Sequence, residues 1–327
     1  MNTPSILIKF RDLIISGLEK ALTGDSLLYP ILRYHVGLEG GSGERTEHLG
    51  KLLRPSLVLF TATELGADTR NALPAAVALE LIHNFSLIHD DIQDGDRLRR
   101  GRPTVWALHG TAQGINAGDL METIAVREAL SAGPQVTETL VFATIEMIEG
   151  QGLDLSFETR ETTVEEYMEM IDKKTGALIR CSFVLGGIVA QAEEETIGRL
   201  SDFGAALGRA FQIRDDLLGI WGNDAVTGKP HGSDIRRRKK SLPVVVGLSR
   251  ASGADRAILV ETYRKESLTD TDVADVVAVL ERIGAREIAE RMVKDHLDEA
   301  EKVLITLPFP HKEEMYELID YLARREK

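Results

Sequence analysis

Apolar residues recur at spacings of three and four through most of this 327-residue chain. That period is typical of amphipathic α-helices, whereas the strict alternation of a half-buried strand is nearly absent. Glycine and proline clusters separate the periodic segments, and no Pro/Ser-rich linker or long repeat divides the chain. We therefore predict an all-α fold, one domain over residues 1–327 with ten or more helices. The predicted helical segments are 51–66, 73–92, 113–130, 136–153, 164–190, 194–221, 241–250 and 272–305.

Composition narrows the class of protein. The net charge of −13 argues against a nucleic-acid binder, and we expect the basic run 236–240 to be a solvated arm. The single cysteine, Cys181, excludes an internal disulfide and suits a reducing cytosol. The N-terminus has no signal-peptide pattern, and no apolar run reaches the roughly 18 residues of a membrane span. We therefore expect a soluble cytoplasmic protein.

An apolar segment, 79–88, leads directly into three aspartates, Asp90, Asp91 and Asp94. At about 100° per residue, Asp90 and Asp94 share one helical face and Asp91 lies next to it. Carboxylates at the C-terminal end of a helix meet the negative end of its dipole, so a cation is needed nearby. A solvated helix end would be the simpler explanation if this segment stood alone.

A second apolar segment, 211–219, carries Gln212, Asp215 and Asp216 on one helical face. Oxygen ligands without a matching set of His and Cys are typical of Mg²⁺, which usually binds together with substrate phosphates. The two acidic segments together therefore predict a cavity for Mg²⁺ and a phosphorylated substrate.

Basic residues near these segments suit direct contact with phosphate. Lys51 and Arg54 lie on the predicted first turn of a helix, where cations are unfavourable unless an anion joins them. Arg99 and Arg100 can each bind phosphate oxygens through a planar fork of donors. Three lysines lie later in the chain: Lys174, Lys229 and Lys239. Separate acids and bases indicate two diphosphates, one bound through metal and one bound by Lys and Arg alone.

These motifs resemble those of trans-isoprenyl diphosphate synthases, the family of farnesyl and geranylgeranyl diphosphate synthases. The matching stretches, in family order, are GKLLRP (50–55), ELIHNFSLIHDDIQD (80–94), RRGRPT (99–104), NAGD (116–119), KTGALI (174–179), FQIRDD (211–216) and TGKPHGSDIRRRKKSLP (227–243). The resemblance implies an all-α bundle around a deep central cavity, usually a homodimer. It implies Mg²⁺-dependent condensation of isopentenyl diphosphate with an allylic diphosphate, with two or three ions bound.

The resemblance also implies a role for each matching residue. The residues that hold Mg²⁺ on the allylic diphosphate would be Asp90, Asp91, Asp94, Asp215 and Asp216. The residues that contact that same diphosphate would be Arg99, Lys174, Lys229 and Lys239. Isopentenyl diphosphate would be bound without metal by Lys51, Arg54, His83 and Arg100. Thr175 and Gln212 would line the reacting carbons. A satisfied core histidine is the alternative for His83.

Two positions depart from the family pattern. Gly219 stands where a third aspartate is expected, and Asp224 or Asp234 is a candidate replacement. Glu122 and Thr123 interrupt a run that is usually apolar and lines the chain tunnel. If these two side chains face inward, the tunnel is unusually polar.

Phe85 and Ser86 are the predicted determinants of product length. Phe85 precedes Asp90 by five residues, which places it about 7.5 Å deeper along the helix. An aromatic at that position followed by a small residue resembles short-chain enzymes that make C20 products, with C15 next. Plain core packing is the alternative for Phe85.

Two other functions compete with prenyl transfer. A class I terpene cyclase also uses aspartates and Mg²⁺, but it needs no second diphosphate site, and the basic residues of that site are all present. A regulatory subunit of a heteromeric synthase typically loses its acids, whereas five of the six expected aspartates remain here.

Overall fold

The computed structural model describes residues 3–46, 49–222 and 231–324, and these residues are predominantly helical. The N-terminal half contains α1 (Ser5–Lys9), α2 (Arg11–Ala21), α3 (Leu28–Val36), α4 (Leu53–Glu64), α5 (Thr69–Gln93), α6 (Val105–His109), α7 (Thr111–Ala132) and α8 (Pro134–Phe157). The C-terminal half contains α9 (Val164–Ile171), the π-helix η1 (Asp172–Gly176), α10 (Ala177–Val189), α11 (Glu194–Trp221), α13 (Ser233–Arg236), α14 (Leu242–Arg250), α15 (Gly253–Arg264), α16 (Asp270–Arg282), α17 (Ala285–Thr306) and α18 (Glu313–Arg324). The prediction of an all-α fold is confirmed; the single domain stays a prediction.

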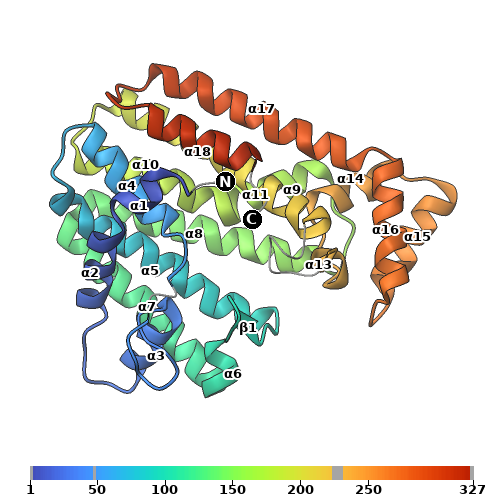
Figure 1. Ribbon diagram of the computed structural model, residues 1–327, viewed down its shortest axis with the longest axis horizontal. Coiled ribbons are helices and arrows are strands. Elements are labelled where there is room, and N and C mark those ends of the chain that lie inside the picture. Colours follow the sequence, from blue (N-terminus) through green and yellow to red (C-terminus); the bar gives the residue numbers. More distant parts are fainter. Residues whose placement is uncertain (1–2, 47–48, 223–230, 325–327) are drawn as a thin grey trace.

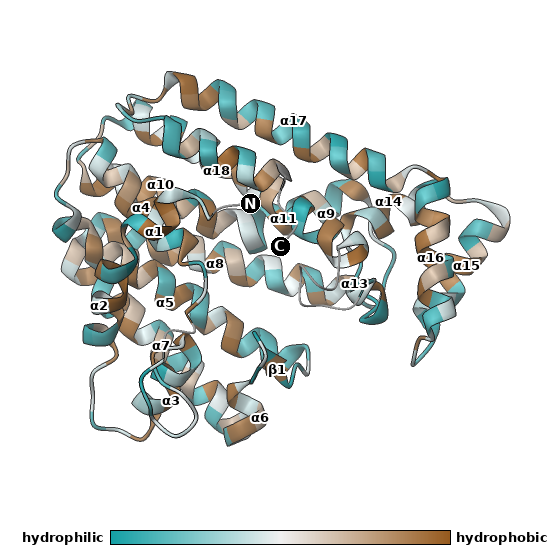
Figure 2. Cartoon of the chain, in the orientation of Figure 1, coloured by the Kyte–Doolittle hydropathy of each residue, from teal (hydrophilic) through white to brown (hydrophobic). Residues whose placement is uncertain are grey.

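The central helices are apolar on nearly every side. In α5, every residue from Ala75 to Ile82 is buried, as expected for a helix surrounded by other helices. α5 packs against α4, α7 and α10, and α11 packs against α10 and α17. Figure 1 shows α17 and α18 side by side along one edge of the bundle, with α15 and α16 at one end. In Figure 2 hydrophilic and hydrophobic residues alternate along α17 and α18, which fits their outer position.

α5 is also long and apolar enough to cross a membrane by length and composition. Within its most apolar window, however, 67% of the residues are buried against other parts of the protein. A core helix of a soluble bundle passes the same test, so α5 is weak support for a membrane span.

The predicted helix 164–190 is not continuous, because η1 interrupts it. A Cβ on Gly208 of α11 would lie 2.9 Å from the Cα of Gly176, and a Cβ on Gly150 of α8 would overlap the backbone of Lys174. These two glycines therefore let neighbouring helices approach the η1 backbone directly. Single π-turns occur frequently at functional sites, and this one carries Lys174 and Thr175.

The predicted helix 272–305 is divided as well. Gly284 adopts a left-handed conformation (φ 73°), which ends α16 and begins α17. Local periodicity continues across this break, so the sequence pattern alone does not reveal it.

Between α5 and α6 lies a small hairpin of two strands, β1 (Leu98–Arg99) and β2 (Arg102–Pro103). Arg100 and Gly101 form its turn, and both have positive φ, 52° and 75°. The left-handed conformation is unusual for arginine, and such backbone strain often accompanies a functional position.

Candidate active site

A cavity of about 580 Å³ lies between α5, α8, η1 and α11. Its volume is within the range of small-molecule sites. Eleven of the predicted site residues line it: Arg54, His83, Phe85, Ser86, Asp90, Arg99, Arg100, Lys174, Thr175, Gln212 and Asp215. The two acidic segments and most of the basic residues therefore meet at one place, although they are far apart in the chain.

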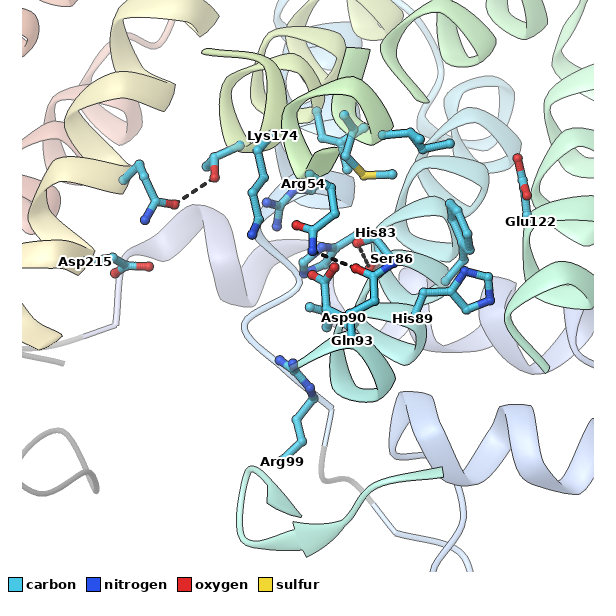
Figure 3. Close-up of a pocket in the computed structure, with 18 of the residues that line it drawn as sticks. Arg54, His83, Ser86, His89, Asp90, Gln93, Arg99, Glu122, Lys174 and Asp215 are labelled. Carbon is cyan, nitrogen blue, oxygen red and sulfur yellow. Dashed lines mark hydrogen bonds between the residues drawn. The ribbon is translucent and has the colours of Figure 1, made fainter. Parts of the chain in front are cut away.

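Asp90 and Asp215 enter this cavity from different helices, α5 and α11, and Lys174 enters it from η1 (Figure 3). Burial raises the pKa of Asp90 to about 6; Lys174 lowers it in part, and the Asp94 carboxylate raises it further. A buried carboxylate with a raised pKa is stabilised in its charged form by an added cation. An added cation would therefore stabilise the charged form of Asp90.

Lys174 and Thr175 are each held by a neighbour across the cavity wall. Lys174 forms an ion pair with Asp154 of α8. The Thr175 hydroxyl donates a hydrogen bond to Oε1 of Gln212 at 2.7 Å. η1 is thereby tied to α8 and α11 at the point where both side chains face the cavity.

Asp91 lies beside the cavity, in a smaller pocket that it shares with Arg99 and Arg100. Its Oδ1 accepts a hydrogen bond from Nε of Arg99 at 2.8 Å, and its buried Oδ2 has no partner among the described residues. Burial raises the pKa of Asp91 to about 6, although Arg99 lowers it. An unpaired buried oxygen is costly, so Asp91 has capacity for one more cationic contact.

Asp94 is the C-cap residue of α5. Its carboxylate lies 3.4 Å from Nη2 of Arg237, and it is not part of the cavity wall. The three aspartates of the first segment thus have three different surroundings.

Asp216 is completely buried and lies outside the cavity wall. Its Oδ2 accepts hydrogen bonds from the Tyr167 hydroxyl and from the backbone N–H of Leu242 (2.8 Å). Its Oδ1 accepts from Nε2 of Gln212 (3.1 Å) and from Nζ of Lys239 (3.4 Å). Because both oxygens are occupied, Asp216 here positions its neighbours.

Lys239 also lies outside the cavity wall, between two carboxylates. Its Nζ is 3.4 Å from Asp216 and 3.9 Å from Asp234. Burial lowers the pKa of Lys239, but these carboxylates raise it to a net value above the ordinary one. Lys229 and Asp224 lie outside the described residues.

A group of cationic side chains covers the wall next to Asp90. Burial lowers the pKa of His83 well below its usual range, and Arg54 and Arg100 lower it further, so its imidazole is neutral. Burial also lowers the pKa of Arg54, whereas the nearby carboxylate of Glu80 raises it. The Nε atom of Arg54 is buried without a hydrogen-bond partner among the described residues. This wall therefore holds donors suited to an anion.

Lys51 precedes α4. The prediction that it lies on the first turn of this helix is therefore wrong. Leu52, in a left-handed conformation (φ 53°), separates it from the helix. Lys51 Nζ donates a hydrogen bond to the Tyr321 hydroxyl (2.8 Å) and lies 5.3 Å from the centre of that ring. The C-terminal helix α18 thus holds Lys51, which does not line the cavity.

Several residues of the site carry no recognisable sequence signal. Asp154, Tyr167 and Tyr321 bind predicted site residues, but each lies in a helix that is distant along the chain. Met147 and Ile148 line the cavity from α8. In the sequence nothing distinguishes them from other apolar residues of that helix. Glu122 faces the cavity, so the polar interruption found in the sequence does reach the tunnel.

The oxygen ligands fit Mg²⁺ that binds together with a phosphate. Among the described residues no group of three or more His, Cys, Asp or Glu side chains forms a closed metal site. Mg²⁺ commonly uses one or two carboxylates and takes its other ligands from water and substrate phosphates. Asp90 and Asp215 across the cavity, with the unpaired oxygen of Asp91 nearby, meet that requirement.

Comparisons with known proteins point to one family. The model of the family described as "Polyprenyl synthetase" matches residues 42–280. The chain is 37% identical to the (2E,6E)-farnesyl diphosphate synthase of Mycobacterium bovis, over 92% of this chain and 87% of that one. It is 39% identical to a geranylgeranyl diphosphate synthase of Mycobacterium tuberculosis, over 77% of this chain and 73% of that one. The crystal structure of a polyprenyl synthetase from Streptomyces coelicolor A3(2) superposes with a TM-score of 0.91 at 34% identity, covering 98% and 99% of the two chains.

Proposed function

This chain belongs to the polyprenyl synthetase family of trans-prenyltransferases, and we propose that it condenses isopentenyl diphosphate with an allylic diphosphate. The main product is geranylgeranyl diphosphate, and the reaction depends on Mg²⁺. One observation carries this proposal: Asp90 and Asp215 face one cavity whose adjoining wall is cationic, so two diphosphates can bind by different means.

The chain's own residues divide the work between the two substrates. Lys174 and Arg99 donate hydrogen bonds to the allylic diphosphate, and Arg54 and Arg100 bind isopentenyl diphosphate. Asp90, Asp91, Asp94 and Asp215 would hold Mg²⁺, which would neutralise charge on the leaving diphosphate. The allylic C–O bond breaks, and the double bond of isopentenyl diphosphate attacks the resulting cation. A proton then passes to the departing diphosphate.

The apolar side of the cavity protects the cation from water. Phe85, Met147 and Leu178 line it, and exclusion of water prevents premature capture of the cation. Thr175 and Gln212, held together by their hydrogen bond, stand near the reacting carbons. Lys239 and Asp216 hold the C-terminal part of α11 in place.

Phe85 and Ser86 both line the cavity, and an aromatic residue followed by a small one at these positions supports a C20 product. Farnesyl diphosphate is the alternative product, because the relatives include synthases named for either length.

An assay with purified protein tests the function. Isopentenyl diphosphate, Mg²⁺ and either dimethylallyl, geranyl or farnesyl diphosphate are incubated, and the dephosphorylated products are separated by chromatography. Longer prenyl diphosphates are expected, and excess chelator should abolish them. A hydrocarbon product would indicate a terpene cyclase, and no product at all would favour a regulatory subunit.

Matched variants connect the activity to the site. Asp90→Asn and Asp215→Asn should each lower kcat by roughly 10²-fold or more, because each removes stabilisation of the leaving group. Asp202→Asn is the control: Asp202 is exposed on the same helix as Asp215 and lies away from the cavity. Equal activity in all three variants would contradict the assignment.

The homodimer and the cytoplasmic location remain part of this proposal. Val141, Phe142, Ile145 and Ile148 form an exposed apolar stripe on α8, and Phe142 alone is 61% exposed. A stripe of this kind is typical of a helix covered by another subunit, which supports a second copy of the chain. Light scattering of the purified protein measures its mass directly.

A further inference from the structure

Among the described residues three acidic side chains line the cavity, and Glu122 on α7 is the one that belongs to neither aspartate segment. The packing of α5 against α7 determines its depth. A Cβ on Gly114 would lie 2.8 Å from Cδ1 of Ile92, and a Cβ on Gly118 would overlap the ring of His89. Residue numbers rise on α7 as they fall on α5, so the two helices are antiparallel. One further turn in each direction brings Glu122 opposite Phe85.

Phe85 and Glu122 therefore stand on two sides of the tunnel at one level. That level is about 7.5 Å along α5 from Asp90. His89 packs edge-on against Phe85, with the ring centres 5.1 Å apart. Figure 3 shows Glu122 and His89 at the side of the cavity away from Asp215. A chain that grows from the aspartates reaches Glu122 when it reaches Phe85.

The charge of Glu122 is not neutralised by its surroundings. Glu122 has no hydrogen bond or ion pair with any residue in the described ranges. His89, the basic side chain that affects its pKa, lies 3.6 Å from the Asp119 carboxylate. Burial and Asp119 raise the pKa of Glu122, whereas His89 lowers it. In its charged form, a carboxylate without such a partner needs water for its solvation.

We propose that Glu122 determines product length by placing a hydrated carboxylate at the depth where Phe85 narrows the tunnel. A prenyl chain that passed this level would strip water from the carboxylate without replacing its hydrogen bonds, which is strongly unfavourable. Steric closure by Phe85 and charge at Glu122 thus act together. The inference rests on the proposed prenyl transfer.

The test compares product lengths of Glu122→Leu and Glu122→Gln with those of the wild-type protein. Glu122→Leu should raise the ratio of the next longer product to the main product at least about tenfold, because an apolar wall accepts the chain. Glu122→Gln keeps the shape and removes the charge, so a smaller increase in the same direction is expected. Thr123→Leu is the control, since Thr123 is exposed and outside the cavity wall.

A double variant tests whether the ring of Phe85 and the charge of Glu122 each limit product length. Phe85→Ala/Glu122→Leu should give products longer than those of either single variant. An active Glu122→Leu protein with wild-type product lengths would overturn the role of Glu122 while leaving the proposed function intact. A wild-type protein that makes no elongated diphosphate would overturn both.

Discussion

The carboxylate of Asp234 occupies the space beside Gly219 where a side chain on α11 would have to lie. The Ser233 hydroxyl donates a hydrogen bond to the Gly219 carbonyl oxygen at 3.2 Å, which fixes α13 against α11. Asp234 is buried and shares Lys239 with Asp216. A carboxylate from α13 therefore stands near the place where family members carry the third aspartate of the second segment.

Gly219→Ala should destabilise the protein, because the added Cβ would overlap Asp234. Overpacking of this kind costs about 1–3 kcal/mol of unfolding free energy. Urea denaturation followed by circular dichroism measures the change. Gly198→Ala is the matched control on the same helix: its Cβ would meet nothing within 4 Å, and alanine there should stabilise the protein slightly. Equal stability of Gly219→Ala and wild type would contradict the close approach.

Tyr167→Phe should lower the unfolding free energy by about 1–3 kcal/mol, since it removes a hydrogen bond from the completely buried carboxylate of Asp216. The same denaturation experiment detects the loss. Tyr316→Phe is the control, because Tyr316 is an exposed residue of α18 and should change stability by less than about 0.5 kcal/mol. A neutral Tyr167→Phe variant would show that other donors satisfy Asp216.

Lys51→Met should raise KM for isopentenyl diphosphate roughly tenfold and leave kcat almost unchanged. Lys51 follows Gly50, which lies against the Arg100 guanidinium, and does not itself line the cavity beside Asp90. Its charge should therefore contribute equally to ground state and transition state. Steady-state kinetics with each substrate varied in turn separate the two constants. Lys20→Met, an exposed lysine of α2, provides the control. A large fall in kcat would instead place Lys51 at the reacting bond.

Phe85→Ala should lengthen the product by about one isoprene unit, because the ring lines the cavity at a level about 7.5 Å along α5 from Asp90. Chromatography of the dephosphorylated products shows the shift. Products of unchanged length from an active variant would mean that Phe85 serves core packing alone.

His35 makes stability depend on pH in the mildly acidic range. Burial lowers the pKa of His35 to about 3, and Arg99, Arg100 and Arg102 contribute to the lowering. In the unfolded chain the pKa has its ordinary value of 6.5, so the unfolded chain takes up the proton first as the pH falls. The contribution of neutral His35 to the free energy of unfolding is therefore complete above pH 6.5 and declines as the pH falls toward 3. At pH 5 the loss amounts to about 2 kcal/mol.

Between pH 7 and pH 5, the unfolding free energy of His35→Gln should therefore fall by about 2 kcal/mol less than that of the wild type. Urea denaturation at both pH values gives the comparison, and carboxylates that titrate in this range affect both proteins alike. Parallel pH profiles would show that His35 is accessible to protons in the folded state.

The helices and the chemical types of the site residues could be predicted because both depend on which residues are neighbours in the sequence. Three- and four-residue spacing identified most of α4, α5, α7, α8 and α11, since a helix face repeats with its neighbours in the chain. Paired aspartates on apolar segments pointed to a cation for the same reason. Spacing predicted poorly where backbone geometry changed within a helix, as at η1 and Gly284.

What the sequence by itself determined is the all-α class, the acidic and basic segments and the family to which they belong. Only the tertiary structure decided that Asp90 and Asp215 face the cavity while Asp216 is enclosed by Tyr167, Lys239 and the Leu242 backbone. Neighbouring residues on a helix point in directions about 100° apart, so adjacent aspartates meet different surroundings. Those surroundings come from helices distant in the chain, which no local pattern can specify.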